Sequence, residues 1–384
     1  MRPAPISSPA ARRENGIGAL RLLFATLVIV SHSPEMLDGD LRRDPLHMVF
    51  HTLSFGQLSV DAFFLISGYL IAASFAASSS VRAYFTKRIL RIYPAFVICS
   101  LLCVAIVAPL GGAHLQSLSI GDWGRLAYRV ALLKAPEVNE AFSNVPFHPG
   151  LNGSAWSISY EFRCYILAAA LGLIGLYRRR RLFVALTAAM VAANLVLFWP
   201  GLLNFTPPGW VVATFGEPDQ QARLLAAFMI GTCFWLYGKD VVLKGRYALA
   251  AAVPLFGLMF VPPLAETALL LLGGYILFWV AFEVRWKPLL TINAKDDISY
   301  GVYLYAWPIA ALLIYYWRDI PLEVLTGITF LGAAACGLAS WLAVERPAMK
   351  WKLRRTGNQA HIDTPTILKQ GNLGPDGEVQ RGEA

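Results

Sequence analysis

Ionisable side chains are rare within the long apolar stretches of this 384-residue chain, so the few that occur there are candidates for chemistry. They include His32, Asp61 and Glu161, together with Arg21, Arg88 and Arg91. An imidazole accepts a proton near neutral pH, and carboxylates can orient it, so the first three residues predict acid–base chemistry. Guanidinium groups bind phosphate through paired hydrogen bonds, so the arginines predict an anionic, phosphate-bearing ligand.

The composition places these groups in a membrane. Hydrophobic residues make up 57% of the chain and charged residues 15%, whereas soluble domains are about a quarter charged. The apolar residues form runs that approach the roughly 20 residues of a spanning helix. The five cysteines lie in such runs and form no CxxC pair, which argues against a disulfide framework or a zinc site. We therefore predict an all-α, polytopic membrane helix bundle and exclude a soluble enzyme.

Apolar runs bounded by charge, proline or glycine predict about ten transmembrane helices. Their approximate limits are 17–37, 54–77, 88–110, 154–176, 181–200, 221–238, 246–262, 264–283, 298–317 and 321–344. With the N-terminus inside, 22 Lys and Arg residues lie in inner segments and six in outer ones, so the positive-inside rule predicts that both termini are cytoplasmic. The net charge of +9 is then mainly a topology signal and gives little support for nucleic-acid binding.

This topology divides the chain into three parts. We expect a cytoplasmic N-terminal segment at 1–16, a transmembrane domain at 17–347 and a disordered cytoplasmic tail at 348–384. The longest outer loop should cover about 111–153, and a second outer loop about 200–220.

Helical geometry relates the candidate residues to one another. Arg21 and His32 are eleven residues apart, which is about three turns, so they share one helix face about 16 Å apart. Arg88 and Arg91, three apart, also project from one face. The direction of each predicted span places the histidine and the two carboxylates in the outer half of the membrane and the arginines toward the inner side. We therefore expect a donor to enter from one side and an acceptor from the other.

Each candidate also has a structural alternative. Arg88 and Arg91 suit ordinary anchors at the cytoplasmic surface. The structural alternative for His32 is an interhelical hydrogen bond. For Asp61 it is neutralisation of a charged neighbour or capping of a helix. Glu161 suits a structural pair with Arg163, although residues two apart face different sides of a helix. Spacing and depth alone leave these alternatives open.

Six segments around these positions follow one another in a recognisable order. They are LRLLFATLVIVSH at Leu20–His32, SVDAFFLISGYL at Ser59–Leu70, RILRIYP at Arg88–Pro94, NGSAWSISYEFRCY at Asn152–Tyr165, SYGVYLYAWP at Ser299–Pro308 and VERP at Val344–Pro347. Together they resemble the motifs of the acyltransferase 3 family of integral membrane O-acyltransferases. The resemblance extends over most of the chain, and its specificity comes from all six segments occurring in order.

The resemblance implies transfer of an acyl group, commonly acetyl from acetyl-CoA, to a hydroxyl of a cell-surface or lipid-linked glycan. The enzyme would be a multi-pass protein of the plasma (inner) membrane, surrounded by lipid, and would bind no nucleic acid. Acetyl-CoA or another short acyl-CoA would be a donor substrate and not a permanently bound cofactor. No metal-ligand cluster is evident, so we expect no catalytic metal.

The resemblance also implies roles for individual residues. His32 would be the catalytic histidine, and Glu161 and Asp61 would be acids of the same site. The donor would be bound by three arginines, Arg21, Arg88 and Arg91. Four further residues would bind the acceptor or line the site, namely Ser67, Trp156, Ser157 and Tyr303.

Four positions depart from the family's pattern. Ser33 follows the first histidine, where family members often have other small or acidic residues. Ala306 stands where the late motif has a second histidine, so a proton relay through that side chain cannot operate. Arg163 adds a charge, and Cys164 replaces the usual Phe. These departures affect the expected acceptor more than the reaction class. Because only a short segment follows the last span, the chain resembles stand-alone members without a fused hydrolase-like domain.

A second class of function also fits the intramembrane residues. In a transporter or exporter of a lipid-linked glycan, His32, Asp61 and Glu161 would form a proton or substrate pathway. A third possibility is a carrier that passes acyl groups across the membrane for a separate transferase. The arginine pair facing the cytoplasm favours a CoA-type donor, and no internal repeat typical of transporters is evident. We therefore favour the acyltransferase.

Overall fold

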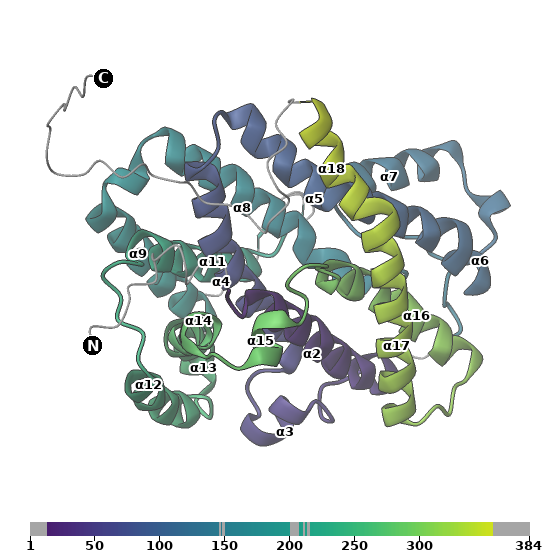
Figure 1. Ribbon diagram of the computed structural model, residues 1–384. Coiled ribbons are helices and arrows are strands. Elements are labelled where there is room, and N and C mark those ends of the chain that lie inside the picture. The colour runs from purple at the N-terminus through teal and green to yellow at the C-terminus, as the bar shows by residue number, and fades with distance from the viewer. Residues whose placement is uncertain are drawn as a thin grey trace, which may run out of the picture.

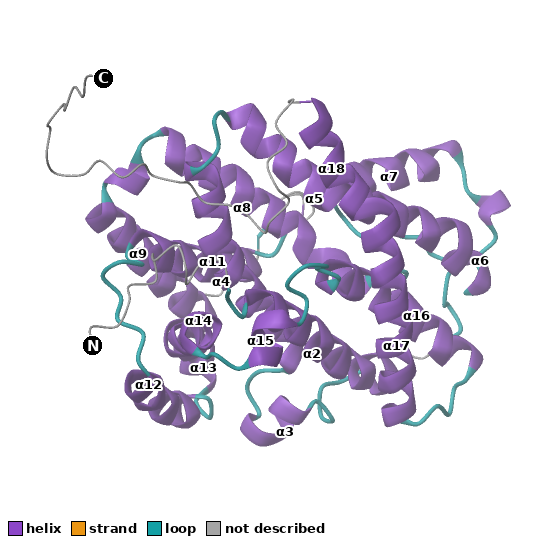
Figure 2. Ribbon diagram, viewed as in Figure 1, coloured by secondary structure: helices purple, strands orange, loops and turns teal. Residues whose placement is uncertain are grey.

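A computed structural model describes residues 14–145, 147, 150–199, 207–209, 212 and 216–355 (Figure 1). In these ranges every regular element is a helix, as Figure 2 shows, which confirms the all-α prediction. The α-helices are α2 (Ile17–Asp38), α3 (Pro45–Phe50), α4 (Phe55–Ala76), α5 (Val81–Leu102), α6 (Ala108–Leu110), α7 (Ile120–Ala131), α8 (Trp156–Leu173), α9 (Arg180–Phe198), α11 (Pro218–Leu236), α12 (Gly245–Leu258), α13 (Pro262–Ala268), α14 (Gly274–Glu283), α15 (Lys287–Thr291), α16 (Ser299–Tyr316), α17 (Leu322–Ser340) and α18 (Arg346–Arg355).

Each of the ten predicted spans coincides with a helix or with two helices joined end to end. The joins are the π-helical turns Cys103–Val107, Leu269–Gly273 and Trp341–Glu345. Among the described residues, five helices are long and apolar enough to cross a membrane, namely Ile17–Asp38, Phe55–Ala76, Val81–Leu110, Pro262–Glu283 and Leu322–Lys350. The chain is therefore an integral membrane protein. The count of ten crossings and the cytoplasmic position of both termini stay predictions.

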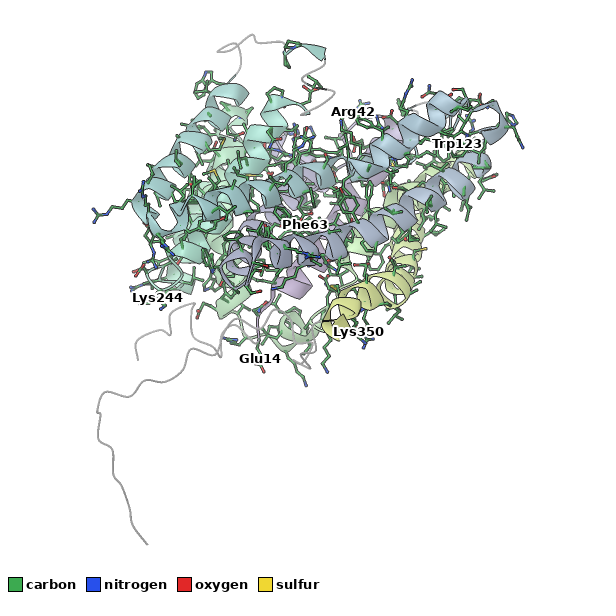
Figure 3. The ribbon with its side chains drawn as sticks, turned by 90° about the horizontal axis from the view of Figure 1, so that it is seen from above. Glu14, Arg42, Phe63, Trp123, Lys244 and Lys350 are labelled. Atoms are coloured by element: carbon green, nitrogen blue, oxygen red, sulfur yellow. The ribbon has the colours of Figure 1, made fainter. Side chains whose placement is uncertain are left out.

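Residues assigned to opposite sides of the membrane lie at opposite edges of the molecule. In Figure 3, Glu14, Lys244 and Lys350 lie toward the lower edge, whereas Arg42 and Trp123 lie toward the upper edge. The first three belong to predicted inner segments and the other two to predicted outer ones. Most of the second predicted outer loop, the start of the N-terminal segment and the tail from residue 356 lie outside the described residues.

The predicted outer loop at 111–153 is partly helical and partly buried. It contains α7, which packs on α5, and the Tyr93 hydroxyl donates a hydrogen bond to the Ala131 carbonyl (2.9 Å). The loop then returns into the bundle. Asn152 is buried, and its amide nitrogen donates to the Leu304 carbonyl of α16 (2.9 Å). The chain just before α8 is therefore fixed against α16, next to the residues described below.

The start of α4 is fixed by side-chain hydrogen bonds. The Ser54 hydroxyl accepts from the Gln57 amide, and the Gln57 side chain accepts from the Ser54 amide, which together form a capping box. The buried Asp44 carboxylate also accepts from the Phe55 amide (3.0 Å). These contacts fix the end of a helix that carries two of the candidate site residues, Asp61 and Ser67.

Helices α4 and α11 approach so closely that a glycine is required between them. A Cβ atom added to Gly231 would lie 1.9 Å from the Leu65 carbonyl oxygen. Nearby, the Thr232 hydroxyl donates to the Gly68 carbonyl (3.1 Å). Small residues at helix contacts let membrane helices pack backbone to backbone, which is the main source of attraction between them.

Gly231→Ala is therefore expected to separate α4 from α11 and to destabilise the protein by more than about 3 kcal/mol, above the usual cost of overpacking. Thermal unfolding in detergent measures the loss. Gly257→Ala on α12 is the matched control, because a Cβ atom there meets nothing within 4 Å. Equal unfolding temperatures for the two variants would show that the close approach is not needed.

Candidate active site

His32 forms a close pair with a carboxylate one helical turn away. Its Nδ1 lies 2.6 Å from Oε2 of Glu35, and both residues belong to α2, where positions three apart share a face. An ionised Glu35 accepts a hydrogen bond from Nδ1–H, which leaves Nε2 with a free lone pair. The pair therefore has the arrangement of a general base with an orienting carboxylate.

The His32 ring packs against α16 and against the turn that precedes α8. Its centroid lies 4.8 Å from that of Trp307, in an edge-on contact. Trp307 also covers Gly153, where a Cβ atom would lie 2.4 Å from the indole ring. A glycine at this position thus allows the indole to lie between the turn and the imidazole.

Tyr303, one turn before Trp307 on α16, holds the same turn. Its hydroxyl donates to the Ser154 carbonyl (2.5 Å) and lies 2.7 Å from the Ser157 hydroxyl. Its ring also meets Phe63 of α4 edge-on, with 6.1 Å between centroids. Tyr303 and Ser157 are therefore in direct contact. Trp156 packs edge-on against Tyr160, with 5.5 Å between their ring centroids.

Glu161 is held between α4 and α8 by two hydroxyl donors. The Ser67 hydroxyl lies 2.9 Å from Oε1 of Glu161, and the Tyr165 hydroxyl lies 2.6 Å from the same atom. Because charge-assisted hydrogen bonds favour the ionised acceptor, these donors suit a carboxylate in a fixed position. The structure thus brings together Ser67 and Glu161, two of the predicted site residues.

Two of the three predicted donor-binding arginines converge on one aspartate. The Arg21 guanidinium forms a very short ion pair with Oδ2 of Asp297, and Nη2 of Arg91 lies 2.6 Å from the same oxygen. Burial opposes ionisation of Asp297, but the two guanidinium groups outweigh it and hold the pKa of this carboxyl well below its usual range. Asp297 precedes α16, and Asn293 and Ser299 also donate to it.

Arg91 has a second carboxylate partner, whereas Arg88 pairs with no carboxylate among the described residues. Nη1 of Arg91 lies 2.8 Å from Oε2 of Glu345, in the π-helical turn before α18. Arg88 lies with its Cζ 5.8 Å from the centre of the Tyr165 ring. Its Nε is buried and finds no hydrogen-bond partner among the described residues. The Nε donor of Arg88 is therefore unused by the described residues.

Arg21 and Arg91, which both pair with Asp297, form the arginine cluster. One face of α16 connects this cluster with His32. Tyr300 lies beneath the Arg91 guanidinium (5.8 Å), Tyr303 follows one turn later, and Trp307 contacts His32 after another turn. These three positions span about 10 Å along the helix. Arg21 and His32 lie toward the two corresponding ends of α2, which packs against α16, so both groups lie along one helix contact.

Asp61 lies on a different face of α4. Its Oδ1 is 3.6 Å from Nη1 of Arg223 on α11, and these residues are 0% and 2% exposed. A second buried acid, Glu266 of α13, accepts from the amide of Asn194 on α9 (3.0 Å). We refer to Asp61, Arg223, Glu266 and Asn194 as the buried polar cluster. In the described part of the chain, no contact joins His32, Asp61 and Glu161 directly, although all three were expected in one group.

Five ionisable residues of these groups were not singled out as site residues from the sequence, namely Glu35, Asp297, Arg223, Glu266 and Glu345. Glu35 had a local signal, because it follows His32 by three positions within a predicted helix. Arg223 and Glu266 lie inside predicted spans and could have been found by the same search. Asp297 had no local signal, because its partners at positions 21 and 91 are distant in sequence.

Among the described residues, no three His, Cys, Asp or Glu side chains are close enough to hold a metal ion. A histidine–carboxylate pair and an arginine cluster along one helix contact of a membrane helix bundle suit an integral membrane enzyme that binds an anionic ligand. Comparison with known proteins makes this class more specific. The chain belongs to the acyltransferase 3 family, whose model, described as an acyltransferase domain, matches residues 14–344. The protein is therefore an acyltransferase, as the sequence motifs indicated.

Characterised relatives extend over nearly the whole chain. An O-acetyl transferase of Shigella phage Sf6 is 26% identical over 87% of this chain and 96% of its own length. Nodulation protein 10 of Rhizobium leguminosarum bv. viciae is 24% identical over 90% of this chain and 96% of its own length. Acyltransferase MdmB of Streptomyces mycarofaciens is 28% identical over a shorter segment, 31% of this chain and 29% of the relative. No solved structure matches the chain.

Proposed function

We propose that this protein transfers an acetyl group from acetyl-CoA to a hydroxyl of a cell-surface or lipid-linked glycan. The observation that carries the proposal is the contact between α2 and α16, with the His32–Glu35 pair toward one end and the arginine cluster toward the other. The phage relative named as an O-acetyl transferase supports acetyl as the transferred group.

The proposed reaction uses His32 as the general base. As the acceptor hydroxyl oxygen attacks the thioester carbonyl carbon, its proton passes to Nε2 of His32. The new C–O bond forms, the C–S bond breaks, and the proton then passes from His32 to the CoA sulfur. Glu35 stabilises the imidazolium through Nδ1–H, because a carboxylate accepting this hydrogen bond favours the charged ring. Glu161, held by Ser67 and Tyr165, orients the reacting groups.

The two substrates would approach from opposite sides. The predicted topology of ten spans with cytoplasmic termini puts the arginine cluster toward the cytoplasm, where acetyl-CoA is present. It puts His32 toward the outer side of the plasma (inner) membrane, where a lipid-linked or surface glycan is accessible. Phosphate groups of the donor would bind the guanidinium groups through charge-assisted hydrogen bonds.

Mass spectrometry of the surface polysaccharide, from cells with and without the gene, tests this function. We expect loss of a discrete acyl mass when the gene is absent, and the mass difference identifies acetyl, succinyl or another group. Polysaccharide of unchanged mass and unchanged amount would contradict the proposal.

Arg88→Ala is expected to raise the KM for acetyl-CoA by about tenfold or more, which corresponds to one hydrogen bond to a charged group. The physical reason is the buried Nε of Arg88, which has no partner among the described residues. Steady-state rates in membrane vesicles at varied acetyl-CoA measure the change. Arg82→Ala, at an exposed position one and a half turns earlier on α5, is the matched control. Equal KM values for both variants would make Arg88 a membrane anchor.

A transporter of a lipid-linked glycan is the second candidate, and the buried polar cluster favours it. Two acids and one arginine buried among membrane helices commonly mark a proton or ion pathway. In that case, loss of the gene should lower the amount of surface glycan and leave the mass of its repeating unit unchanged.

A further inference from the structure

Tyr165 contacts two of the proposed site residues from a buried position on α8, where it is 3% exposed. Its hydroxyl donates a hydrogen bond to Oε1 of Glu161 (2.6 Å), one turn earlier on the same helix. Its ring lies against the guanidinium of Arg88 on α5, with 5.8 Å between Cζ and the ring centre. One side chain thus touches both a proposed acid and a proposed donor-binding arginine.

The backbone of Tyr165 is fixed from α5 as well. The hydroxyl of Tyr84, a fully buried residue of α5, donates to the Tyr165 carbonyl (2.9 Å). A tyrosine side chain has only two rotatable bonds. Because the backbone and both ends of the side chain are in contact with neighbours, Tyr165 forms a rigid link between α5 and Glu161.

A second donor holds the Glu161 carboxylate from a third helix. The Ser67 hydroxyl of α4 lies 2.9 Å from the same Oε1 that accepts from Tyr165. The carboxylate is therefore fixed relative to both α4 and α8, and the Tyr165 ring relates it to Arg88 of α5.

Both contacts of Tyr165 suit the charges of its partners. An ionised carboxylate accepts strong hydrogen bonds, and the face of an aromatic ring attracts a guanidinium group. Among the described residues, Arg88 and Glu161 both contact Tyr165 and form no ion pair with each other. An ion pair would neutralise both groups, whereas contacts with a neutral tyrosine leave both charges in place.

We propose that Tyr165 is a positioning residue that sets Glu161 and Arg88 relative to each other. This inference rests on the proposed function, in which Arg88 binds the acyl donor and Glu161 orients the reacting groups. The hydroxyl of Tyr165 acts on the chemical step through Glu161, and its ring acts on donor binding through Arg88. Substitutions that remove one contact or both therefore have different effects on kcat and KM.

Tyr165→Phe tests the proposal, because it removes the hydroxyl and keeps the ring. We expect kcat to fall about tenfold, the effect of one lost hydrogen bond to a charged group, with the KM for acetyl-CoA unchanged. Steady-state rates in membrane vesicles at varied acetyl-CoA measure both constants. Tyr177→Phe is the matched control, because this hydroxyl also contacts α8, where it donates to the Ala168 carbonyl (2.8 Å).

A second variant, Tyr165→Met, removes the ring as well and fills its space with a flexible apolar side chain. We expect the same loss in kcat and, in addition, a KM for acetyl-CoA about threefold higher, the effect of a lost cation–π contact. Thermal unfolding in detergent shows whether each variant is folded. If Tyr165→Met does not fold, Tyr165→Phe decides the question, because a normal kcat contradicts the role of the hydroxyl and a raised KM contradicts the role of the ring.

The outcomes separate this inference from the proposed function. A wild-type enzyme without acetyl transfer would overturn the proposed function. An active wild-type enzyme whose Tyr165→Phe variant keeps a normal kcat would overturn only the role of Tyr165. An equal loss in Tyr177→Phe, or a normal KM in a folded Tyr165→Met variant, would assign the effect to helix packing or to Glu161 alone and would also overturn it.

Discussion

Replacing His32 with glutamine is expected to lower the rate of acyl transfer by about 10²–10⁴-fold, the range that a positioned general base contributes. Glutamine can still donate a hydrogen bond toward Glu35, whose carboxylate lies 2.6 Å from Nδ1 of His32. It has no nitrogen that accepts a proton near neutral pH, so it cannot take the proton of the acceptor hydroxyl. Transfer of labelled acetyl from acetyl-CoA in membrane vesicles measures the rate.

The control for this variant is a histidine outside the site. His114→Gln changes an exposed residue on the predicted outer loop and should leave the rate unchanged. The amount of His32→Gln protein in the membrane and its unfolding temperature should match those of the wild type, because His32 is only partly buried. A folded His32→Gln variant that transfers acetyl at a near-normal rate would remove the catalytic assignment.

The placement of His32 and Arg21 illustrates what periodicity can predict. Eleven residues of helix return to nearly the same face, and the structure has both side chains in contact with α16 or the segment just before it. The contact between Ser67 and Glu161 joins two predicted residues as well. In each case a regular helix carries the residue, and the number of residues along the helix determines where the side chain points.

Asp61 illustrates what depth alone cannot predict. Its position along α4 gives its level in the membrane, but the partner depends on the direction in which the side chain points around the helix. Ser67 contacts α8 from α4, whereas Asp61, six residues earlier, points toward Arg223 of α11. The structural alternative for Asp61, neutralisation of a charged neighbour, is the contact that the structure contains.

Asp297 and Glu345 show a second limit, which is long-range pairing. Arg91 binds both acids, although they lie 206 and 254 residues away in sequence. No local pattern relates such positions, because only the packing of α2, α5, α16 and α18 brings them together. Positive charge near the predicted inner surface therefore suggested a ligand site, and the structure adds two protein carboxylates to it.

Arg223→Met is expected to be the most damaging change outside the proposed catalytic residues. Arg223 pairs with Asp61 and lies close to Glu266, and all three side chains are buried. Removing one partner of a buried pair typically costs about 3–5 kcal/mol, because the remaining charge has no counter-charge. We expect a much lower amount of folded protein in the membrane and a lower unfolding temperature in detergent.

A surface ion pair provides the control. Arg180 and Asp240 form a pair at 3.3 Å in which both side chains are at least half exposed. Exposed pairs contribute little, about 0–1 kcal/mol, so Arg180→Met should leave the unfolding temperature nearly unchanged. If Arg223→Met behaved like Arg180→Met, the buried polar cluster would contribute nothing to stability.

The double variant Asp61→Asn with Arg223→Met then distinguishes the two interpretations of Asp61. It removes both charges of the pair, and replacing a whole buried pair is often neutral for stability. Folding should therefore recover at least in part relative to Arg223→Met alone.

If acetyl transfer per folded molecule also recovers, Asp61 serves the helix bundle by balancing Arg223. If the folded double variant transfers no acetyl, the carboxylate of Asp61 is needed for the reaction, as the sequence motif predicts. Because both measurements are made on the same membranes, a loss of fold cannot be mistaken for a loss of chemistry.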